Sequence, residues 1–284
     1  MIEWNEQRLE ELVRKMGLKR VPGQGKTPIH LSLYNPHWNP EPLLTKIMCL
    51  DASKWTALGY DETDRVSVVR HLGSLGCRTD DAWSAAARNQ QPLTLELAKA
   101  LLDAGTFDKE ALSYAVCYQR PLPLDLAKLL IDAGAFNKDA LQAAAESQRP
   151  LTLELAKLLI DAGAFNKDAL WRAARYQQPL ALELAKLLID AGCNPAEQED
   201  GWCKGWDALV WLAVDDHPVD PQVTDLFLSA GCRRDLDGCR YIDDRCRSSF
   251  DQILKEHAQW KESLNRMSAE NSPTDTSYGP DWGR

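Results

Sequence analysis

The sequence predicts an all-α solenoid, in which helical hairpins stack side by side. A 29-residue phrase recurs four times in the middle of the chain, opening at Pro92, Pro121, Pro150 and Pro179. Each copy holds two short stretches with helical spacing of apolar residues, and each copy closes on an Ala-Gly pair or its equivalent. Self-similarity at a fixed period of this size is typical of stacked repeats, in which neighbouring hairpins share one elongated core.

The copy from Lys138 to Gly163 shows the expected elements. Residues 139–145 predict a short first helix, with Asp139 as its N-cap or first-turn acid. Pro150 ends that helix, because proline cannot continue a helix interior. Residues 151–162 predict a second helix whose leucines follow helical spacing, and Gly163 stops it because glycine adopts a positive φ at little cost. One such hairpin cannot bury its apolar face alone, so the copies must stack.

Divergent copies and caps are expected on both sides of the central array. An early copy spans Thr27 to Cys77, with an inserted loop at 35–40 and a second helix at 66–75, and a last copy has helices starting at Asp207 and Val223. Solenoids need caps that shield their terminal cores. The residues that suit the caps are Trp4, Leu9, Leu12, Val13 and Met16 at the start and Phe250, Ile253 and Leu254 at the end. The predicted organisation is a capping helix at 1–24, repeats at 25–232 with central copies at 79–193, a cap at 233–262 and a disordered tail at 263–284.

Two segments carry a resemblance to a known family. The segment 155–164, Leu-Ala-Lys-Leu-Leu-Ile-Asp-Ala-Gly-Ala, resembles the second helix of an ankyrin repeat, and Gly25 to Leu31 resembles the Thr-Pro-Leu-His start of an ankyrin first helix. The resemblance covers roughly residues 25–232 and implies a right-handed stack that binds proteins, with structural roles for Thr27 and His30. Ankyrin repeats run to about 33 residues. The shorter period leaves no room between Gly134 and Asp139 for the family's β-hairpin finger, which argues against finger-tip binding by the central copies.

Composition limits the expected location and partners. The chain has 33 Lys and Arg against 42 Asp and Glu, a formal charge of −9. An acidic surface disfavours nucleic acid, whose phosphates need cationic side chains, and favours a basic protein partner. The first residues lack a signal-peptide pattern, and no apolar run is long enough to span a membrane. A cytoplasmic protein, with monomer favoured, is therefore expected.

Candidate catalytic, metal and cofactor motifs are all incomplete. Gly23 to Thr27 ends like a phosphate-binding loop, but Arg20 stands where the motif needs its first glycine. The group at 215–217, Asp-Asp-His, precedes a proline in a turn, where polar residues are expected anyway. His30 and His37 lack further ligands, and Cys203, Cys239 and Cys246 lack a Cys-x-x-Cys pair. We expect no enzyme, no catalytic residue, no metal and no cofactor.

Variation between the copies indicates a contact surface. The framework is nearly invariant, whereas columns of the first helix and the following turn change freely; one column holds Ser84, Ser113, Gln142 and Trp171. Aromatic residues and arginine are common interface anchors, and ankyrin-like first helices line the concave face. The predicted protein-binding residues are Tyr114, Tyr118, Arg149, Trp171, Arg172, Arg175 and Tyr176. Neutral variation of an unconstrained surface, with some rings filling gaps between repeats, explains the pattern equally well.

These observations favour a non-enzymatic protein-binding scaffold. The sharper hypothesis is an inhibitor of the immunity or antitoxin type, which occludes a basic toxin or enzyme, since complementary charge speeds association. An adaptor or effector that docks on a cellular target protein is a close rival. A hydrolase with an unrecognised site is a distant third.

Overall fold

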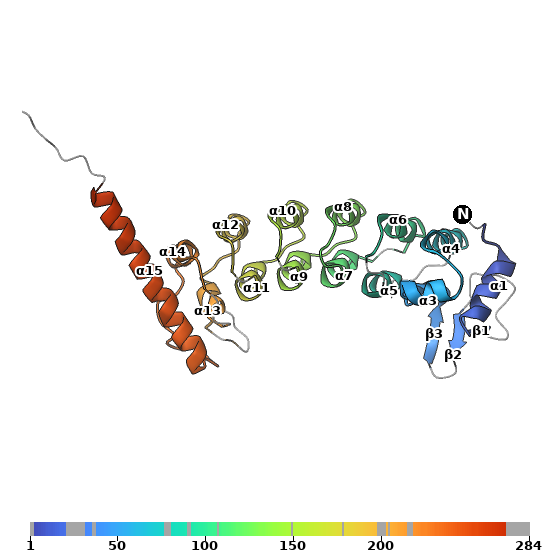
Figure 1. Cartoon of the computed structure of the whole chain (residues 1–284), viewed down its shortest axis with the longest axis horizontal. Coiled ribbons are helices and arrows are strands. Elements are labelled where there is room, and N and C mark those ends of the chain that lie inside the picture. Colours follow the sequence, from blue (N-terminus) through green and yellow to red (C-terminus); the bar gives the residue numbers. More distant parts are fainter. Residues whose placement is uncertain are drawn as a thin grey trace, which may run out of the picture. The chain divides into compact units, whose positions relative to one another are not determined.

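The computed structural model confirms an all-α solenoid of helical hairpins, with one small β-sheet near the N-terminus (Figure 1). The structure describes residues 3–20, 32–35, 38–76, 81–89, 92–106, 108–148, 150–177, 179–197, 203, 205–214 and 218–270. The phosphate-loop-like Gly23 to Thr27, the ankyrin-like His30, the Asp-Asp-His group at 215–217 and the predicted binding residue Arg149 lie outside these ranges.

Two compact units make up the chain. The first comprises residues 1–177 with 190–193, and the second comprises residues 178–189 with 194–284. The division falls inside the fourth helical hairpin, because its first helix (Ala169–Tyr176) belongs to the first unit and most of its second helix (Leu182–Asp190) belongs to the second unit. The sequence had indicated one array through residue 232, and the contacts divide that array.

The central copies of the first unit form two rows of helices (Figure 1). The first helices of the copies pack on one another in one row, and the second helices follow one another in the other. The first row holds α5 (Asp81–Asn89), α7 (Ala111–Tyr118), α9 (Ala140–Ser147) and α11 (Ala169–Tyr176), and the second row holds α6 (Leu95–Asp103), α8 (Leu124–Asp132) and α10 (Leu153–Asp161).

Invariant residues of the repeat fill the core between the rows. On α10, Leu155, Ala156 and Leu159 are buried, and the same three columns are buried on α6 and α8. Each second helix ends at a glycine with positive φ; Gly134 has φ 70° and Gly163 has φ 73°. The amide of Ala164 then donates to the Leu159 carbonyl at 2.8 Å, which satisfies a free carbonyl of the last turn. Burial of each leucine contributes about 2 kcal/mol.

Buried glutamines link each copy to the one before it. The Gln148 side chain is 4% exposed; its Nε2 donates to the carbonyls of Val116 (2.6 Å) and Gln119 (2.7 Å), and its Oε1 accepts from the Leu122 amide (3.0 Å). Gln177 repeats this pattern one copy later. One copy earlier, Gln119 makes two of the corresponding bonds: its Nε2 donates to the Ala87 carbonyl at 2.8 Å, and its Oε1 accepts from the Leu93 amide at 2.7 Å. Each glutamine side chain therefore forms hydrogen bonds with backbone groups near the turn between the two helices that have no partner within a helix.

The short connections before the first helices also bond across copies. The amide of Leu141, in the first turn of α9, donates to the Ala164 carbonyl of the next copy at 3.0 Å. Asp139 is the N-cap residue of α9 but makes no side-chain cap; its carboxylate accepts from Asn166 Nδ2 at 2.7 Å instead. The connection from Asp132 to Ala140 contains no strand, which agrees with the expected absence of a finger.

The N-terminal part of the first unit differs from the prediction. The capping helix is α1 (Glu6–Lys15), which buries Leu9, Leu12 and Val13, but β1 (Lys19–Arg20) also lies inside the range 1–24 expected to be a cap. β1 pairs with β2 (Ser32–Asn35), and β2 pairs with β3 (Trp38–Pro42) across the segment expected to be a loop. Three helices follow: α2 (Leu43–Met48), α3 (Ala52–Ala57) and α4 (Glu62–Ser74), the last starting four residues before the predicted 66.

The second unit contains α12 (Leu182–Asp190), α13 (Ala208–Leu212), α14 (Pro221–Ser229) and α15 (Asp244–Glu270). Asp207, 1% exposed, is a confirmed helix start: its carboxylate accepts from the amides of Leu209 and Val210, each at 3.1 Å, and of Arg233 at 2.8 Å. Burial raises the pKa of this carboxyl, and these amides oppose the rise. Phe250 and Ile253 of α15 are buried, as expected of a cap, but α15 continues to residue 270 through the start of the predicted tail.

Removal of one buried glutamine should destabilise the first unit strongly. Gln148→Ala leaves two carbonyls and one amide without their bonds, so we expect the free energy of unfolding to fall by about 2–4 kcal/mol. Chemical denaturation followed by circular dichroism measures this change. Lys157→Ala, an exposed position on α10, is the matched control and should change stability by less than about 0.5 kcal/mol. Equal effects of the two substitutions would contradict the structural role of Gln148.

Candidate binding face on the first helices

The variable columns of the repeat lie together on one side of the first-helix row. The invariant alanines and leucines of α7, α9 and α11 are buried, whereas the variable side chains of these helices are half-buried at the surface. We call this surface the first-helix face; it comprises Ser113, Tyr114, Cys117 and Tyr118 of α7, Gln142, Ala143, Glu146 and Ser147 of α9, and Trp171, Arg172, Arg175 and Tyr176 of α11. The structure thus brings the predicted residues of α7 and α11 onto one surface, with α9 between them.

The hydroxyl groups of the two tyrosines of α7 both form side-chain hydrogen bonds. Tyr118 accepts a hydrogen bond on its hydroxyl from Arg88 Nη2 at 3.2 Å, and the Arg88 guanidinium carbon lies 5.2 Å from the centre of the Tyr118 ring. Tyr114 donates its hydroxyl proton to Glu110 Oε2 at 3.0 Å. This hydrogen bond and, to a smaller extent, burial raise the pKa of Tyr114 to about 12. Deprotonation would break the bond and place a second negative charge beside the carboxylate.

The four predicted residues of α11 form the most aromatic and most basic part of the face. Arg172 Nε lies 3.1 Å from Glu146 Oε1 of α9, with the two side chains 39% and 36% exposed. The Arg175 guanidinium carbon lies 5.0 Å from the centre of the Tyr176 ring. Pairing with Tyr176 and Glu146 restricts the two arginines, so less freedom is lost when they bind a ligand.

Trp171 departs from the polar pattern of its column. The corresponding Ser113 donates to Asn137 Oδ1 at 2.9 Å, and Gln142 accepts from Asn166 Nδ2 at 2.9 Å. Trp171 has no such amide partner, and its buried Nε1 has no hydrogen-bond partner among the described residues. A half-buried indole at a position that is otherwise polar is a good candidate for a contact anchor.

Two participants were missed when the residues were selected from the sequence. Arg88 and Glu146 occupy one of the variable columns, together with Arg175, but only Arg175 was selected. Their pairings with Tyr118 and Arg172 join adjacent copies, so they help to build the face. This column could have indicated them from the sequence, because it holds two arginines, a glutamate and a cysteine.

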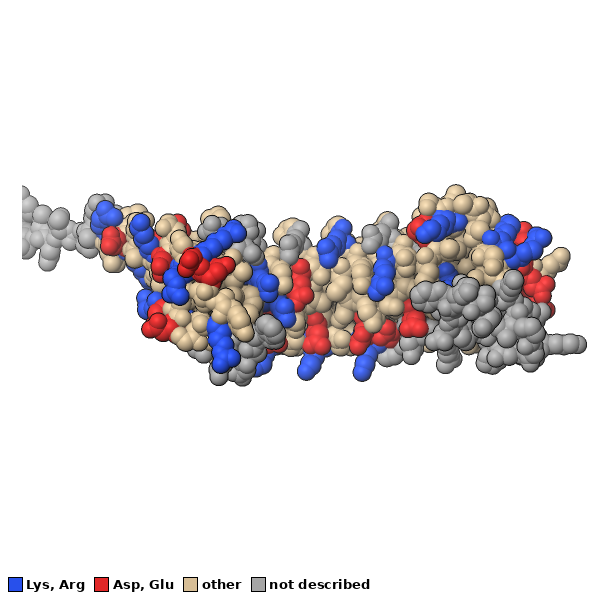
Figure 2. All heavy atoms as spheres, turned by 90° about the horizontal axis from the view of Figure 1, so that it is seen from below, with Lys and Arg blue, Asp and Glu red and all other residues tan. Residues whose placement is uncertain are grey.

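Charge divides the row of first helices into two edges. Basic side chains lie near the helix C-terminal ends: Arg88 on α5, Arg120 just after α7 and Arg175 on α11. Arg172 lies in the middle of α11 and pairs with Glu146, near the C-terminal end of α9. Acidic side chains lie at the N-terminal ends: Asp81, Glu110, Asp139 and Asp168. Figure 2, which views the molecule from the side of this row, shows blue atoms along one edge of its tan middle and red atoms toward the other, with further blue beyond the red. Both arrangements complement the helix dipoles.

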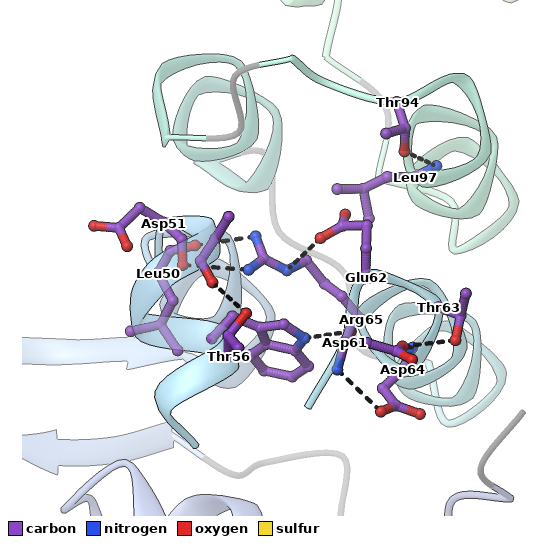
Figure 3. Close-up of polar contacts among 12 residues, drawn as sticks. Leu50, Asp51, Thr56, Asp61, Glu62, Thr63, Asp64, Arg65, Thr94 and Leu97 are labelled. Carbon is purple, nitrogen blue, oxygen red and sulfur yellow. Dashed lines mark hydrogen bonds and ion pairs between the residues drawn. The ribbon is translucent and has the colours of Figure 1, made fainter. Parts of the chain in front are cut away.

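A second candidate lies between α4 and the start of α6. A hollow of about 390 Å³ is lined by Glu62, Thr63, Val66, Arg70, Thr94 and Glu96. Beneath it, the fully buried Arg65 donates to the Leu50 carbonyl at 3.0 Å, and its Nε lies 3.3 Å from Glu62 Oε2 (Figure 3). Burial raises the pKa of Glu62, and Arg65 opposes the rise.

The polar groups of this hollow serve the fold. Thr63 donates to the carboxylate of the N-cap Asp61 at 2.6 Å, and Thr94 caps α6 by accepting from the Leu97 amide at 3.3 Å (Figure 3). Glu62 is paired with Arg65, whose guanidinium ties the α3 start to α4. Thr63, Thr94 and Glu62 thus act in helix caps and one ion pair, and none of these three groups forms a nucleophile–base pair.

The other chemical candidates lie elsewhere. Cys193 and Cys232 are buried, and burial raises the pKa of Cys232. Cys239 lies 2.8 Å from Arg233 Nη1 in the second unit. Within the described residues, no three His, Cys, Asp or Glu side chains gather as a metal site would require, and no helix has the length and apolar character to cross a bilayer.

Comparisons of the chain with family models, with curated proteins and with solved structures find no match.

The raised pKa of Tyr114 gives a direct test of the local geometry. Glu110→Gln removes the negative charge, so the pKa of Tyr114 should fall from about 12 toward its ordinary value of about 10. NMR titration of ring-labelled tyrosine measures it, with Tyr114→Phe used to assign the signal. In the wild type, the stabilisation that this bond provides is present below about pH 10 and is lost as the pH rises toward 12. Glu146→Gln, which leaves Glu110 intact, should not shift this titration.

Proposed function

We propose that this protein binds another protein through the first-helix face and performs no catalysis. The observation that carries the proposal is the separation of the repeat into a buried, invariant framework and a half-buried, variable face. That face gathers two tyrosines, a tryptophan and two arginines on one row of helices, and these residue types dominate the energetics of protein interfaces. Stacked repeats present such rows as extended surfaces for partners.

The relation to ankyrin repeats is part of this proposal. Helical hairpins, glycine stops and a row of first helices all agree with that architecture, and the short connections limit binding to the helical face rather than to fingers. Shared architecture supports binding as a class of function, and it names no partner.

Inhibition by occlusion is the sharper form of the proposal. A wide, preorganised face can cover a toxin or enzyme without any chemistry of its own. The basic partner expected for such an inhibitor rests on the net charge of the chain, which need not be the charge of the face that binds. An adaptor that docks on a cellular target uses the same face, and a hydrolase remains the least supported alternative.

Affinity capture with a face variant tests the proposed function. The face variant carries Tyr114→Ala, Trp171→Ala and Arg172→Ala, and the control carries Lys99→Ala, Lys128→Ala and Lys157→Ala on the exposed sides of the second helices. We expect the wild type and the control to capture the same protein, and the face variant to bind it at least about 30-fold more weakly. Quantitative mass spectrometry, followed by titration of the purified partner, measures this difference.

Partner binding that survives in the face variant would contradict the proposal, provided that circular dichroism shows the variant to be folded. Inhibitor and adaptor are then separated by the partner's own activity. An inhibitor abolishes that activity at a one-to-one ratio, and its loss is toxic only to cells that carry the partner's gene. An adaptor leaves that activity intact.

A further inference from the structure

We propose that the first-helix face selects an acidic, extended segment of its partner, which lies along the basic edge formed by Arg88, Arg120, Arg172 and Arg175. This inference rests on the proposed function and reverses the partner class that the net charge suggests. The inference follows from the local distribution of charged side chains on the first helices rather than from the net charge of the chain.

The local charge of the edge is opposite to that of the chain. The chain carries a formal charge of −9, yet the C-terminal halves of α5, α7, α9 and α11 and the described positions just after them carry three of these arginines, Arg88, Arg120 and Arg175, against a single carboxylate, Glu146. That carboxylate is already paired with Arg172 at 3.1 Å. The acidic excess lies elsewhere, for example on α6, α8 and α10, where each helix exposes two carboxylates and one lysine. A ligand at the basic edge therefore meets a positive surface on an acidic protein.

The arginines are arranged to bind carboxylates. Arg88 lies over the Tyr118 ring and Arg175 over the Tyr176 ring, at 5.2 and 5.0 Å from the ring centres. Arg120 is held by a bond of 3.2 Å from its Nε to the Cys117 carbonyl. A guanidinium held in this way keeps a planar fork of donors that matches a carboxylate in a bidentate manner.

The spacing of the edge favours an extended segment. Packed helices lie about 10 Å apart, so the step from one first helix to the next corresponds to about three residues of extended chain at roughly 3.3 Å per residue. A segment of about nine residues reaches from α5 to α11, with carboxylates at the positions that face the arginines of α5, α7 and α11. The rings of Tyr114, Tyr118 and Trp171 lie on the same face as the basic edge and offer apolar contacts to the residues between the carboxylates.

A displayed library of random peptides of about 12 residues tests this inference, because it presents acidic, neutral and basic segments equally. Selection is made on the wild-type protein. Binding of the selected peptides is then compared with an edge variant, Arg88→Gln, Arg120→Gln and Arg175→Gln, and with a control of equal charge change, Lys99→Gln, Lys128→Gln and Lys157→Gln. We expect peptides enriched in Asp and Glu, weaker binding at higher salt, and an affinity about 10-fold lower for the edge variant alone.

The outcomes separate this inference from the proposed function. Neutral or basic peptides that bind the edge variant normally but lose affinity for Tyr114→Ala with Trp171→Ala would overturn the acidic assignment and leave the binding face standing. Peptides unaffected by both sets of substitutions would contradict both proposals. A library that yields no binder would overturn the inference of an extended acidic segment and leave the affinity-capture test to decide the proposed function. Acidic peptides that the control variant loses equally would place the interaction on the wrong row of helices and would also overturn the inference.

Discussion

The first unit depends on one recurrent constraint: a buried glutamine of one copy must satisfy three backbone groups of the copy before it. In Gln148 and Gln177, two carbonyls and one amide of the turn between helices converge on a single side-chain amide. An unmet hydrogen bond at such a site costs about 1–3 kcal/mol, comparable to the burial of a leucine. The apolar core alone would hold the copies together, but non-directional apolar contacts would not fix the position of one copy relative to the next.

This constraint explains why the first-helix face can vary. The glutamines and the glycine stops allow the backbone hydrogen bonds to form, and the leucines fill the core. The side chains of the exposed columns are not needed for either. Residues as different as Ser113, Gln142 and Trp171 can therefore occupy one column without changing the helix that carries them. Where these side chains do interact across copies, as Arg172 does with Glu146, they order the face rather than support the core.

Much of the fold follows from the sequence because the repeat states it four times. The period, the proline turns and the glycine stops predicted the hairpins, with helix ends displaced by one to a few residues. The repeated glutamines Gln119, Gln148 and Gln177 also recur with the 29-residue period in the sequence. Their hydrogen bonds between copies were not predicted, because the segments before the prolines were interpreted only as turns. Single-copy regions offered no such averaging, so the β2–β3 pairing and the extension of α15 to Glu270 were not predicted.

The candidate site could be predicted in part for the same reason. Tyr114, Tyr118, Trp171, Arg172, Arg175 and Tyr176 stood out because the framework around them is nearly invariant, and the structure places them on one face. The partners of these residues were harder to find. Arg88 reaches Tyr118 across 30 positions of sequence, and only the stacking of copies brings the two residues close. Glu110 lies one helical turn before Tyr114, but outside the variable columns.

Hydrogen exchange at the amides of Leu122 and Leu151 tests the central claim most directly, because these amides donate to the side chains of Gln148 and Gln177. If the glutamines lock the copies together, both amides should exchange only through unfolding of the array, as slowly as the amides inside α8 and α10. Exchange at the rate of exposed turn amides, in a protein whose helices remain protected, would show that the copies slide or open independently and would contradict the account.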